Sequence, residues 1–239
     1  MAQTDVQMKP QSNRLHSAPR SPGRLARWLA PLGLVLFAGN AEALSFRADF
    51  RSSTYQTQAG DSFTDLLLEH QSGGLIQSTV TTGLANISTA VYAAGVTQNY
   101  SILLTTTFDV AVAGSYSFQV GTDWGRGGAA ALIDDATGTI RSERVIPGNV
   151  WWANNWNNAS VVTTTSTLAA GDKIKLAWVG FEDCRGGTST IRFSVDGSAY
   201  QALTTPNFQS YAVVPEPSTA MLFGIGLIGL SLAGNRFDR

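Results

Sequence analysis

Apolar and polar residues alternate along most of the middle of the chain. Between residues 45 and 195, short stretches in which every second residue is apolar recur, and glycine-containing turns separate them. These stretches are rich in Thr, Val, Ile and aromatic residues, which favour β-strands. A period of two places one face of a strand on a core and the other in water. The sequence therefore predicts half-buried strands at residues 45–50, 107–110, 115–120, 173–178 and 190–195.

A helical pattern occurs in one segment, residues 63–70 (FTDLLLEH), with Asp61 or Ser62 as a candidate N-cap. One short helix among many alternating strands indicates an all-β protein. We predict a single antiparallel β-sandwich or jelly roll, flanked by an N-terminal signal peptide and a C-terminal hydrophobic sorting helix.

Residues 1–43 have the pattern of a secretory signal peptide. Basic residues precede an apolar run at 28–38, and small residues, Ala41 and Ala43, occupy the positions that signal peptidase reads. The apolar run is shorter than the roughly 20 residues that span a bilayer, so an N-terminal membrane anchor is the weaker alternative. We expect export through the secretion machinery and cleavage by signal peptidase after Ala43.

Residues 213–239 form a second segment of distinct composition. It contains a short motif, Pro215, Glu216 and Pro217, then an apolar run at 219–234, then two arginines near the end. Sixteen helical residues extend about 24 Å, less than the ~30 Å hydrocarbon core. Such a short transmembrane helix suits transient retention in the inner membrane, with the arginines on the cytoplasmic side.

This tail resembles the PEP-CTERM sorting signal of Gram-negative bacteria in its motif, its apolar helix and its basic end. The resemblance implies recognition by an exosortase, a membrane-bound transpeptidase-like enzyme, and cleavage near the motif. It also implies delivery to the outer surface or to the exopolysaccharide matrix. An ordinary tail anchor is the alternative.

Between these two segments, residues 44–212 form the predicted β-sandwich ectodomain. A chain of that length can bury close to ~70% of its unfolded surface in a single core without disulfides. The whole chain has 16 basic and 17 acidic residues, which argues against a nucleic-acid-binding domain with a basic face. Two His and one Cys are too few for a Cys/His zinc cluster or a multi-disulfide scaffold.

Candidate catalytic groups are few in the ectodomain. His70 is its one histidine, and no nucleophile motif accompanies it. The neighbouring acids Asp134-Asp135 and Glu182-Asp183 would point to opposite faces of a strand, so adjacency does not make an acid–base pair. In a loop such acids could bind Ca²⁺, or they could simply be solvated. We expect a protein that is not an enzyme, with a glycan-acting enzyme as a less favoured alternative.

The segment 151–158 (WWANNWNN) is the most unusual in composition, with three indoles and four carboxamides. Sugar rings stack their C–H faces on aromatic side chains, and carboxamides pair with hydroxyls. We hypothesise that this loop binds carbohydrate. The alternative is that the indoles close the end of the sandwich and the asparagines form turns. The candidate glycan-binding residues are Trp151, Trp152, Asn154, Asn155, Trp156 and, from a neighbouring loop, Trp124.

Two further resemblances concern the ectodomain. The segments 121–128 and 180–187 resemble the CCXG group of PEP-CTERM proteins, which carries two adjacent cysteines where this chain has Cys184 and Arg185. A vicinal disulfide is therefore impossible, and Cys184 is left as a free thiol or an intermolecular bridge. No established activity comes with that group.

Residues 108–195 also resemble protective-antigen-type sugar-binding sandwiches in the order of their strands and of a Thr-Asp-Trp-Gly loop. Those domains often use consecutive acids to hold Ca²⁺, and this chain has Thr122 and Asp123 at the matching point. The resemblance implies sugar binding and leaves the metal open.

Together these patterns predict an exported surface or matrix protein, sorted by an exosortase, whose Trp/Asn loop binds exopolysaccharide. A purely structural matrix protein without a ligand site is the competing interpretation. Threonine runs at 105–107 and 163–165 are explained by β-propensity, and an ice-binding function is less favoured because no solenoid repeat accompanies them.

Overall fold

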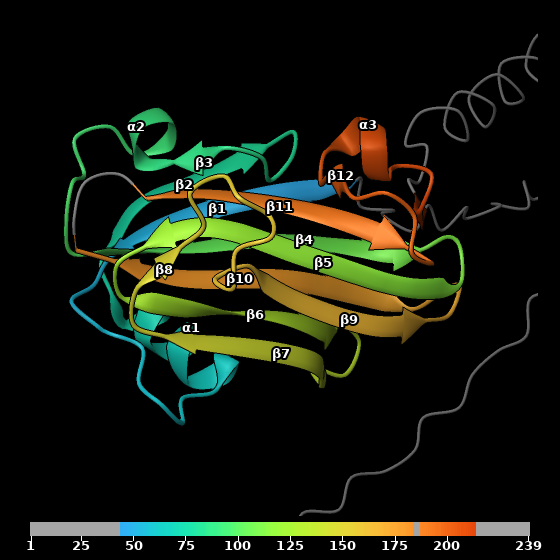
Figure 1. The fold of residues 1–239 in the computed structure, drawn as a ribbon, viewed down its shortest axis with the longest axis horizontal. Helices are drawn as coiled ribbons and strands as arrows, with labels where there is room; N and C mark the ends of the chain where they lie inside the picture. Colours follow the sequence, from blue (N-terminus) through green and yellow to red (C-terminus); the bar gives the residue numbers. More distant parts are fainter. Residues whose placement is uncertain (1–43, 184–186, 214–239) are drawn as a thin grey trace, which may run out of the picture. The chain divides into compact units, whose positions relative to one another are not determined.

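The computed structural model describes residues 44–183 and 187–213. Three helices occur in these residues: α1 (Phe63–Ser72), α2 (Thr89–Tyr92) and α3 (Thr205–Phe208). The strands, shown in Figure 1, are β1 (Ser45–Ser52), β2 (Leu75–Thr81), β3 (Ile87–Ser88), β4 (Tyr100–Val110), β5 (Gly114–Trp124), β6 (Gly127–Asp134), β7 (Ile140–Pro147), β8 (Val150–Trp151), β9 (Val162–Leu168), β10 (Lys173–Glu182), β11 (Thr188–Val195), β12 (Gln201–Ala202) and β13 (Ala212–Val213).

The strands form two antiparallel sheets. The first has the order β2-β1-β4-β10-β6-β7, with β13 paired to β4. The second has the order β12-β11-β5-β8, with β3 paired to β11 and β9 paired to β5. This arrangement confirms the predicted all-β class and the antiparallel β-sandwich.

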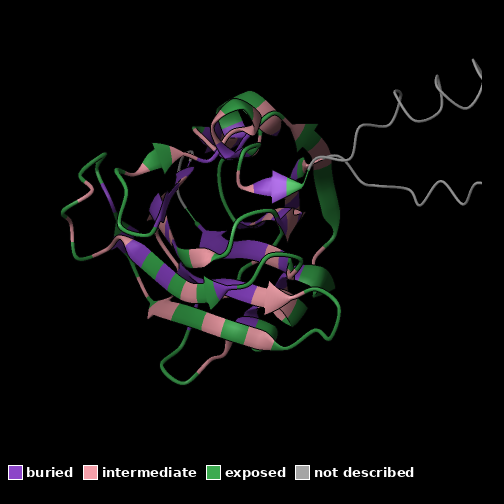
Figure 2. Ribbon diagram, turned by 90° about the vertical axis from the view of Figure 1, so that its right-hand side faces the viewer, coloured by how far each residue is buried: buried purple, intermediate pink, exposed green. Residues whose placement is uncertain are grey.

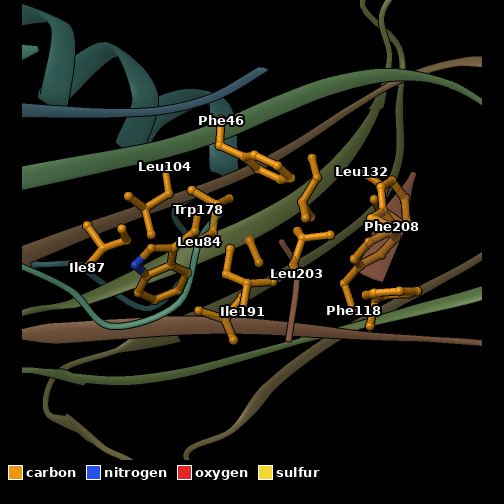
Figure 3. Close-up of a cluster of buried hydrophobic side chains, with 14 of the residues drawn as sticks. Phe46, Leu84, Ile87, Leu104, Phe118, Leu132, Trp178, Ile191, Leu203 and Phe208 are labelled. Atoms are coloured by element: carbon orange, nitrogen blue, oxygen red, sulfur yellow. The ribbon is translucent and has the colours of Figure 1, made fainter. Parts of the chain in front are cut away.

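The main core lies between the two sheets. Side chains alternate between buried and more exposed positions along the strands, as the banding in Figure 2 shows. In β4, for example, Tyr100, Ile102 and Leu104 are fully buried. Figure 3 shows the buried side chains that fill the space between the strands: Phe46, Leu84, Ile87, Leu104, Phe118, Leu132, Trp178, Ile191, Leu203 and Phe208.

The predicted helix is present as α1, which covers the other face of the first sheet. Ser62 is its N-cap: the Ser62 hydroxyl accepts a hydrogen bond from the Asp65 amide, and the Asp65 carboxylate accepts one from the Ser62 amide. Phe63 and Leu66 pack against the apolar side chains of β6 and β10. Strand β10, predicted to be half-buried, is therefore buried on both faces along most of its length.

The helices α2 and α3 are not predicted by the sequence. Each is a single turn, too short to produce a helical period. α3 nevertheless contributes to the core, because Phe208 packs edge-on against Phe108 and Phe193, with ring centroids 4.8 Å away in both pairs.

The predicted signal peptide at 1–43 and almost all of the predicted sorting segment at 213–239 lie outside the described residues, as do Cys184 and Arg185. In the part of the chain that is described, every helix is too short or too polar to cross a membrane.

A candidate ligand site on the outer face of the second sheet

The outer face of the second sheet is polar and nearly uncharged. On β5, residues with buried side chains alternate with Ser117, Gln119 and Asp123, whose side chains point outward, and Gly121 occupies the same face beneath Trp152. Asp123 and Arg192 are the two charged residues on the described strands of this sheet. The segment between β8 and β9 crosses this face (Figure 1).

Asp123 fixes the start of this crossing segment. One oxygen of its carboxylate accepts hydrogen bonds from the backbone amides of Trp152 (2.8 Å) and Ala153 (3.0 Å). The Trp152 carbonyl then accepts a hydrogen bond from the Asn155 amide at 2.9 Å. Ala153 and Asn154 have φ values of 51° and 56°, which are typical of a type I′ turn. Left-handed conformations cost non-glycine residues about 1–3 kcal/mol each, so they persist where neighbouring groups enforce them.

Trp152 is packed flat on the sheet at Gly121. The Trp152 side chain is only 3% exposed. A Cβ atom at position 121 would overlap Cε2 of that indole, so a glycine is required there. Trp156 packs against Trp152 with ring centroids 4.6 Å apart and planes inclined by 58°.

The guanidinium of Arg192 on β11 is in contact with two aromatic rings. Its guanidinium carbon is 4.0 Å from the centroid of Trp156 and 4.6 Å from that of Tyr200. Its Nε donates a hydrogen bond to Oε1 of Gln119 at 2.8 Å, which fixes the plane of the group. Burial lowers the pKa of Arg192 from its usual value.

These side chains line a cavity of about 300 Å³. That volume lies at the lower end of the range of ~300–1,000 Å³ for small-molecule sites, which are typically aromatic-lined with a few polar groups. The side-chain amide nitrogens of Asn86 and Asn154 have no hydrogen-bond partner among the described residues. The lining residues are Asn86, Trp152, Asn154, Trp156, Thr190, Arg192, Tyr200 and Ala202.

Of the residues predicted from the sequence, the fold brings Trp152, Asn154 and Trp156 together in this cavity. Trp151 is 63% exposed and does not line it. Asn155 forms a turn, because its side-chain oxygen accepts a hydrogen bond from the Asn157 amide at 3.1 Å. The alternative interpretation, in which asparagines of this segment make turns, is therefore correct for Asn155.

The prediction that Trp124 contributes to the same site is wrong. Trp124 is 1% exposed, and its Nε1 donates a hydrogen bond to the Ser189 hydroxyl at 2.7 Å within the core. Its ring packs edge-on against Tyr100 with centroids 5.5 Å apart. The reason is strand alternation: Trp124 lies two positions from Thr122 on the inward face of β5, whereas Asp123 points outward.

Arg192, Tyr200, Asn86 and Thr190 are site residues that the sequence does not predict. They lie on strands and connections far from segment 151–158 in the sequence, and only the pairing of β11 with β5 and β3 brings them there. One available signal is Arg192, a single charge in an otherwise uncharged strand.

The acidic pairs and His70 lie elsewhere. Asp134 pairs with Arg141 at 2.6 Å, Asp135 with Lys175 at 3.1 Å and Asp183 with Arg126 at 3.4 Å. A Glu182 oxygen accepts a hydrogen bond from the Gly125 amide at 3.0 Å. Within the two described ranges, no three His, Cys, Asp or Glu side chains are placed to share a metal ion.

His70 lies in the last turn of α1 and is buried, with Nδ1 2.8 Å from the hydroxyl of Ser101 on β4. Burial, together with the nearby charge of Arg51, lowers its pKa to about 4, and Asp49 opposes the shift. At neutral pH this imidazole is therefore uncharged.

A larger cavity of about 590 Å³ lies between the end of β1 and α1. Some of its polar groups are engaged within the chain: the Ser52 hydroxyl accepts a hydrogen bond from the Gly74 amide, and the Tyr55 hydroxyl donates one to Asp61. Tyr55 is the one aromatic residue in the lining of this cavity, whereas Trp152, Trp156 and Tyr200 line the cavity beside Trp156, which is therefore the more aromatic of the two.

Residues 213–236 match the family model of the PEP-CTERM protein-sorting motif. This match confirms the sorting motif predicted from Pro215, Glu216 and Pro217, and indicates an exported protein with a C-terminal sorting signal that is processed by an exosortase. The match does not address the CCXG group. A search of curated proteins finds no match.

Several solved structures are similar to part of the chain. A PA14 sugar-binding domain from an RTX adhesin aligns with 12% identity and a TM-score of 0.45, covering 73% of this chain and 100% of that one. The A domain of epithelial adhesin 9 from Candida glabrata, solved with Galβ1-3GlcNAc, aligns with 12% identity and a TM-score of 0.46, covering 76% and 94%. These scores are too low to transfer a binding site or a ligand.

Proposed function

We propose that this exosortase-sorted, exported protein displays a non-enzymatic carbohydrate-binding domain, and that the cavity beside Trp156 is its glycan site. The proposed setting is the outer surface or the exopolysaccharide matrix, where the ligand would be a matrix polysaccharide. The observation that carries the proposal is the convergence of two indoles with available polar groups around one cavity.

Each part of the cavity suits a sugar. The partly exposed indole of Trp156 offers apolar surface for the C–H face of a ring, and the almost fully buried Trp152 packs against Trp156 and supports it. The amides of Asn86 and Asn154 provide donors and acceptors for hydroxyl groups. The turn held by Asp123 fixes Asn154 in advance, and such preorganisation reduces the ordering cost of binding.

The composition of the cavity lining also supports a binding function rather than catalysis. Its polar members are carboxamides, a threonine, an arginine and a tyrosine. Glycoside hydrolysis generally needs two carboxyl groups that face each other across the scissile bond. The lining residues include neither a carboxylate nor a histidine.

The test is calorimetric titration of the full-length chain, purified in detergent, with cello-, manno- and galacto-oligosaccharides and with oligogalacturonate. We expect saturable binding of at least one of them and a loss of about tenfold or more in Trp156→Ala, in line with truncation of a binding-site aromatic. The matched control is Trp151→Ala, an equally large truncation at an exposed indole outside the cavity lining, which should change affinity by less than about twofold.

Two outcomes contradict the proposal. Failure of the folded protein to bind any of these oligosaccharides would leave the purely structural matrix protein as the better account. Loss of binding in Trp151→Ala but not in Trp156→Ala would place the site on the exposed indole instead of in the cavity.

A further inference from the structure

Arg192 is an unusual residue for its position. It is the one basic residue on the described strands of the second sheet, and it is half-buried in the cavity lining. Five of the other basic side chains of the described domain form ion pairs, namely Arg47, Arg126, Arg141, Lys173 and Lys175.

Arg192 has no such partner within the described ranges. Its one protein hydrogen bond there is the donation from Nε to Gln119, which leaves the Nη1 and Nη2 donors unused by any described residue. The guanidinium lies over the rings of Trp156 and Tyr200, and no hydrogen bond joins it to either residue.

The position of the guanidinium is also well defined. Tyr200 is tied to the sheet because its hydroxyl lies 2.8 Å from the Ser117 hydroxyl, which in turn accepts a hydrogen bond from Thr165 at 3.2 Å. With two rings in contact and Gln119 at Nε, the group is oriented before any ligand arrives.

Holding the Arg192 guanidinium in the cavity lining without a counter-ion costs free energy, and an anionic ligand can offset that cost. A cation that is partly shielded from water without a counter-ion is destabilised, which is the reason that partial burial lowers the pKa of Arg192. A planar carboxylate matches the two remaining donors of a guanidinium in a bidentate pair, the strongest form of this interaction.

We infer that the site takes an acidic glycan, in which the carboxylate of a uronic acid unit pairs with Arg192 while the sugar ring lies against the indole of Trp156. This inference rests on the proposed glycan site and adds the class of sugar. A matrix polysaccharide containing uronic acids is a ligand of this kind.

The experiment compares two probes that differ only at one group of each sugar unit, a carboxylate in one probe and a primary alcohol in the other. The full-length chain in detergent is titrated with oligogalacturonate and with the same oligosaccharide after reduction of its carboxyl groups to primary alcohols. We expect the acidic form to bind about tenfold or more tightly, since hydrogen bonds to charged groups are worth about twice those between neutral groups.

Variants test whether Arg192 is the residue that causes the preference for the acidic probe. Arg192→Gln should bind both probes with equal, weak affinity, whereas Arg192→Lys keeps the charge without the planar fork and should retain part of the preference. The matched control is Arg144→Gln, at an exposed arginine on β7 of the other sheet, which should retain the full preference.

The outcomes separate this inference from the proposed function. Equal binding of both probes by the unmodified protein would overturn the acidic preference and leave the glycan site standing. Failure of both probes and of the neutral oligosaccharides to bind would overturn both. Poly-glutamate is the last probe. If it bound as tightly as oligogalacturonate, and Arg192→Gln lost both, the assignment to a sugar would be overturned, because the site would then recognise negative charge alone.

Discussion

Single residues set the shape of the candidate site. Ala153 has a φ of 51°, a conformation for which alanine is poorly suited, and the Asp123 carboxylate holds it there. Backbone strain of this kind is typical of binding loops, where the local cost keeps a functional geometry in place. Asp123 acts on the loop backbone, whereas its neighbour Trp124 belongs to the core, so only one member of this pair shapes the site.

Residue-level predictions from the sequence succeed where a local rule is sufficient. The N-cap at Ser62 follows from one residue type and its spacing to Asp65. Trp124 and Trp152 cannot be distinguished in that way, because both are indoles near turns. The choice between core and surface depends on the phase of β5, and on the absence of a side chain at Gly121.

His70 predicts a pH-dependent stability. Its folded-state pKa is about 4, against an unfolded value near 6.5, so the unfolded chain binds the proton more readily. The stabilising effect of the neutral imidazole is complete above pH 6.5 and is lost as the pH falls from 6.5 towards 4. The loss amounts to about 3 kcal/mol over that window.

The measurement is urea denaturation of the full-length chain at pH 7 and at pH 4.5. His70→Gln should be less stable at pH 7 but should lose less stability on acidification than the unmodified protein. A parallel loss in the two proteins would show that other groups cause the acid sensitivity.

At the scale of elements, the second sheet positions the site and the first sheet supports the domain. The first sheet is covered by the opposing sheet on one face and by α1 on the other, so β6 and β10 are buried on both sides. The second sheet leaves its outer face to the segment between β8 and β9. The alternation of residues predicts the strands well, but it cannot predict which sheet carries a helix, because that depends on non-local pairing.

The contact between Trp152 and β5 gives a test at this scale. Gly121→Ala places a methyl group against Cε2 of Trp152, closer than the two atoms can pack, so the indole must move and the turn at Ala153 must shift with it. We expect about tenfold weaker glycan binding with the sandwich still folded, because the core side chains of β5 point the other way.

The matched control is Gly74→Ala, just before β2 of the first sheet, where the nearest atom to a new Cβ is the Ser52 hydroxyl oxygen at 3.3 Å. It should leave binding unchanged. Unaltered affinity in Gly121→Ala, measured by the same calorimetry, would show that the position of Trp152 does not matter for the ligand.

For the whole molecule, the most reliable prediction from the sequence is that the protein is exported and carries a sorting signal. The parts of the sorting motif follow one another within one short segment, so a few residues are sufficient to identify it. The match at 213–236 confirms it. The cavity is the opposite case. Asn86, Trp156 and Arg192 lie far apart in the sequence and meet only through sheet pairing, so no local pattern could predict them together.

The central claim is that glycans bind in the cavity beside Trp156, and the tryptophans themselves can report on it. The measurement is the two-dimensional NMR spectrum of the indole N–H groups in the full-length chain, titrated with the tightest-binding oligosaccharide of the calorimetric series. The account predicts saturable shifts for Trp152 and Trp156, and unchanged positions for the core indoles of Trp124 and Trp178. Saturating ligand that leaves Trp152 and Trp156 unshifted would contradict it.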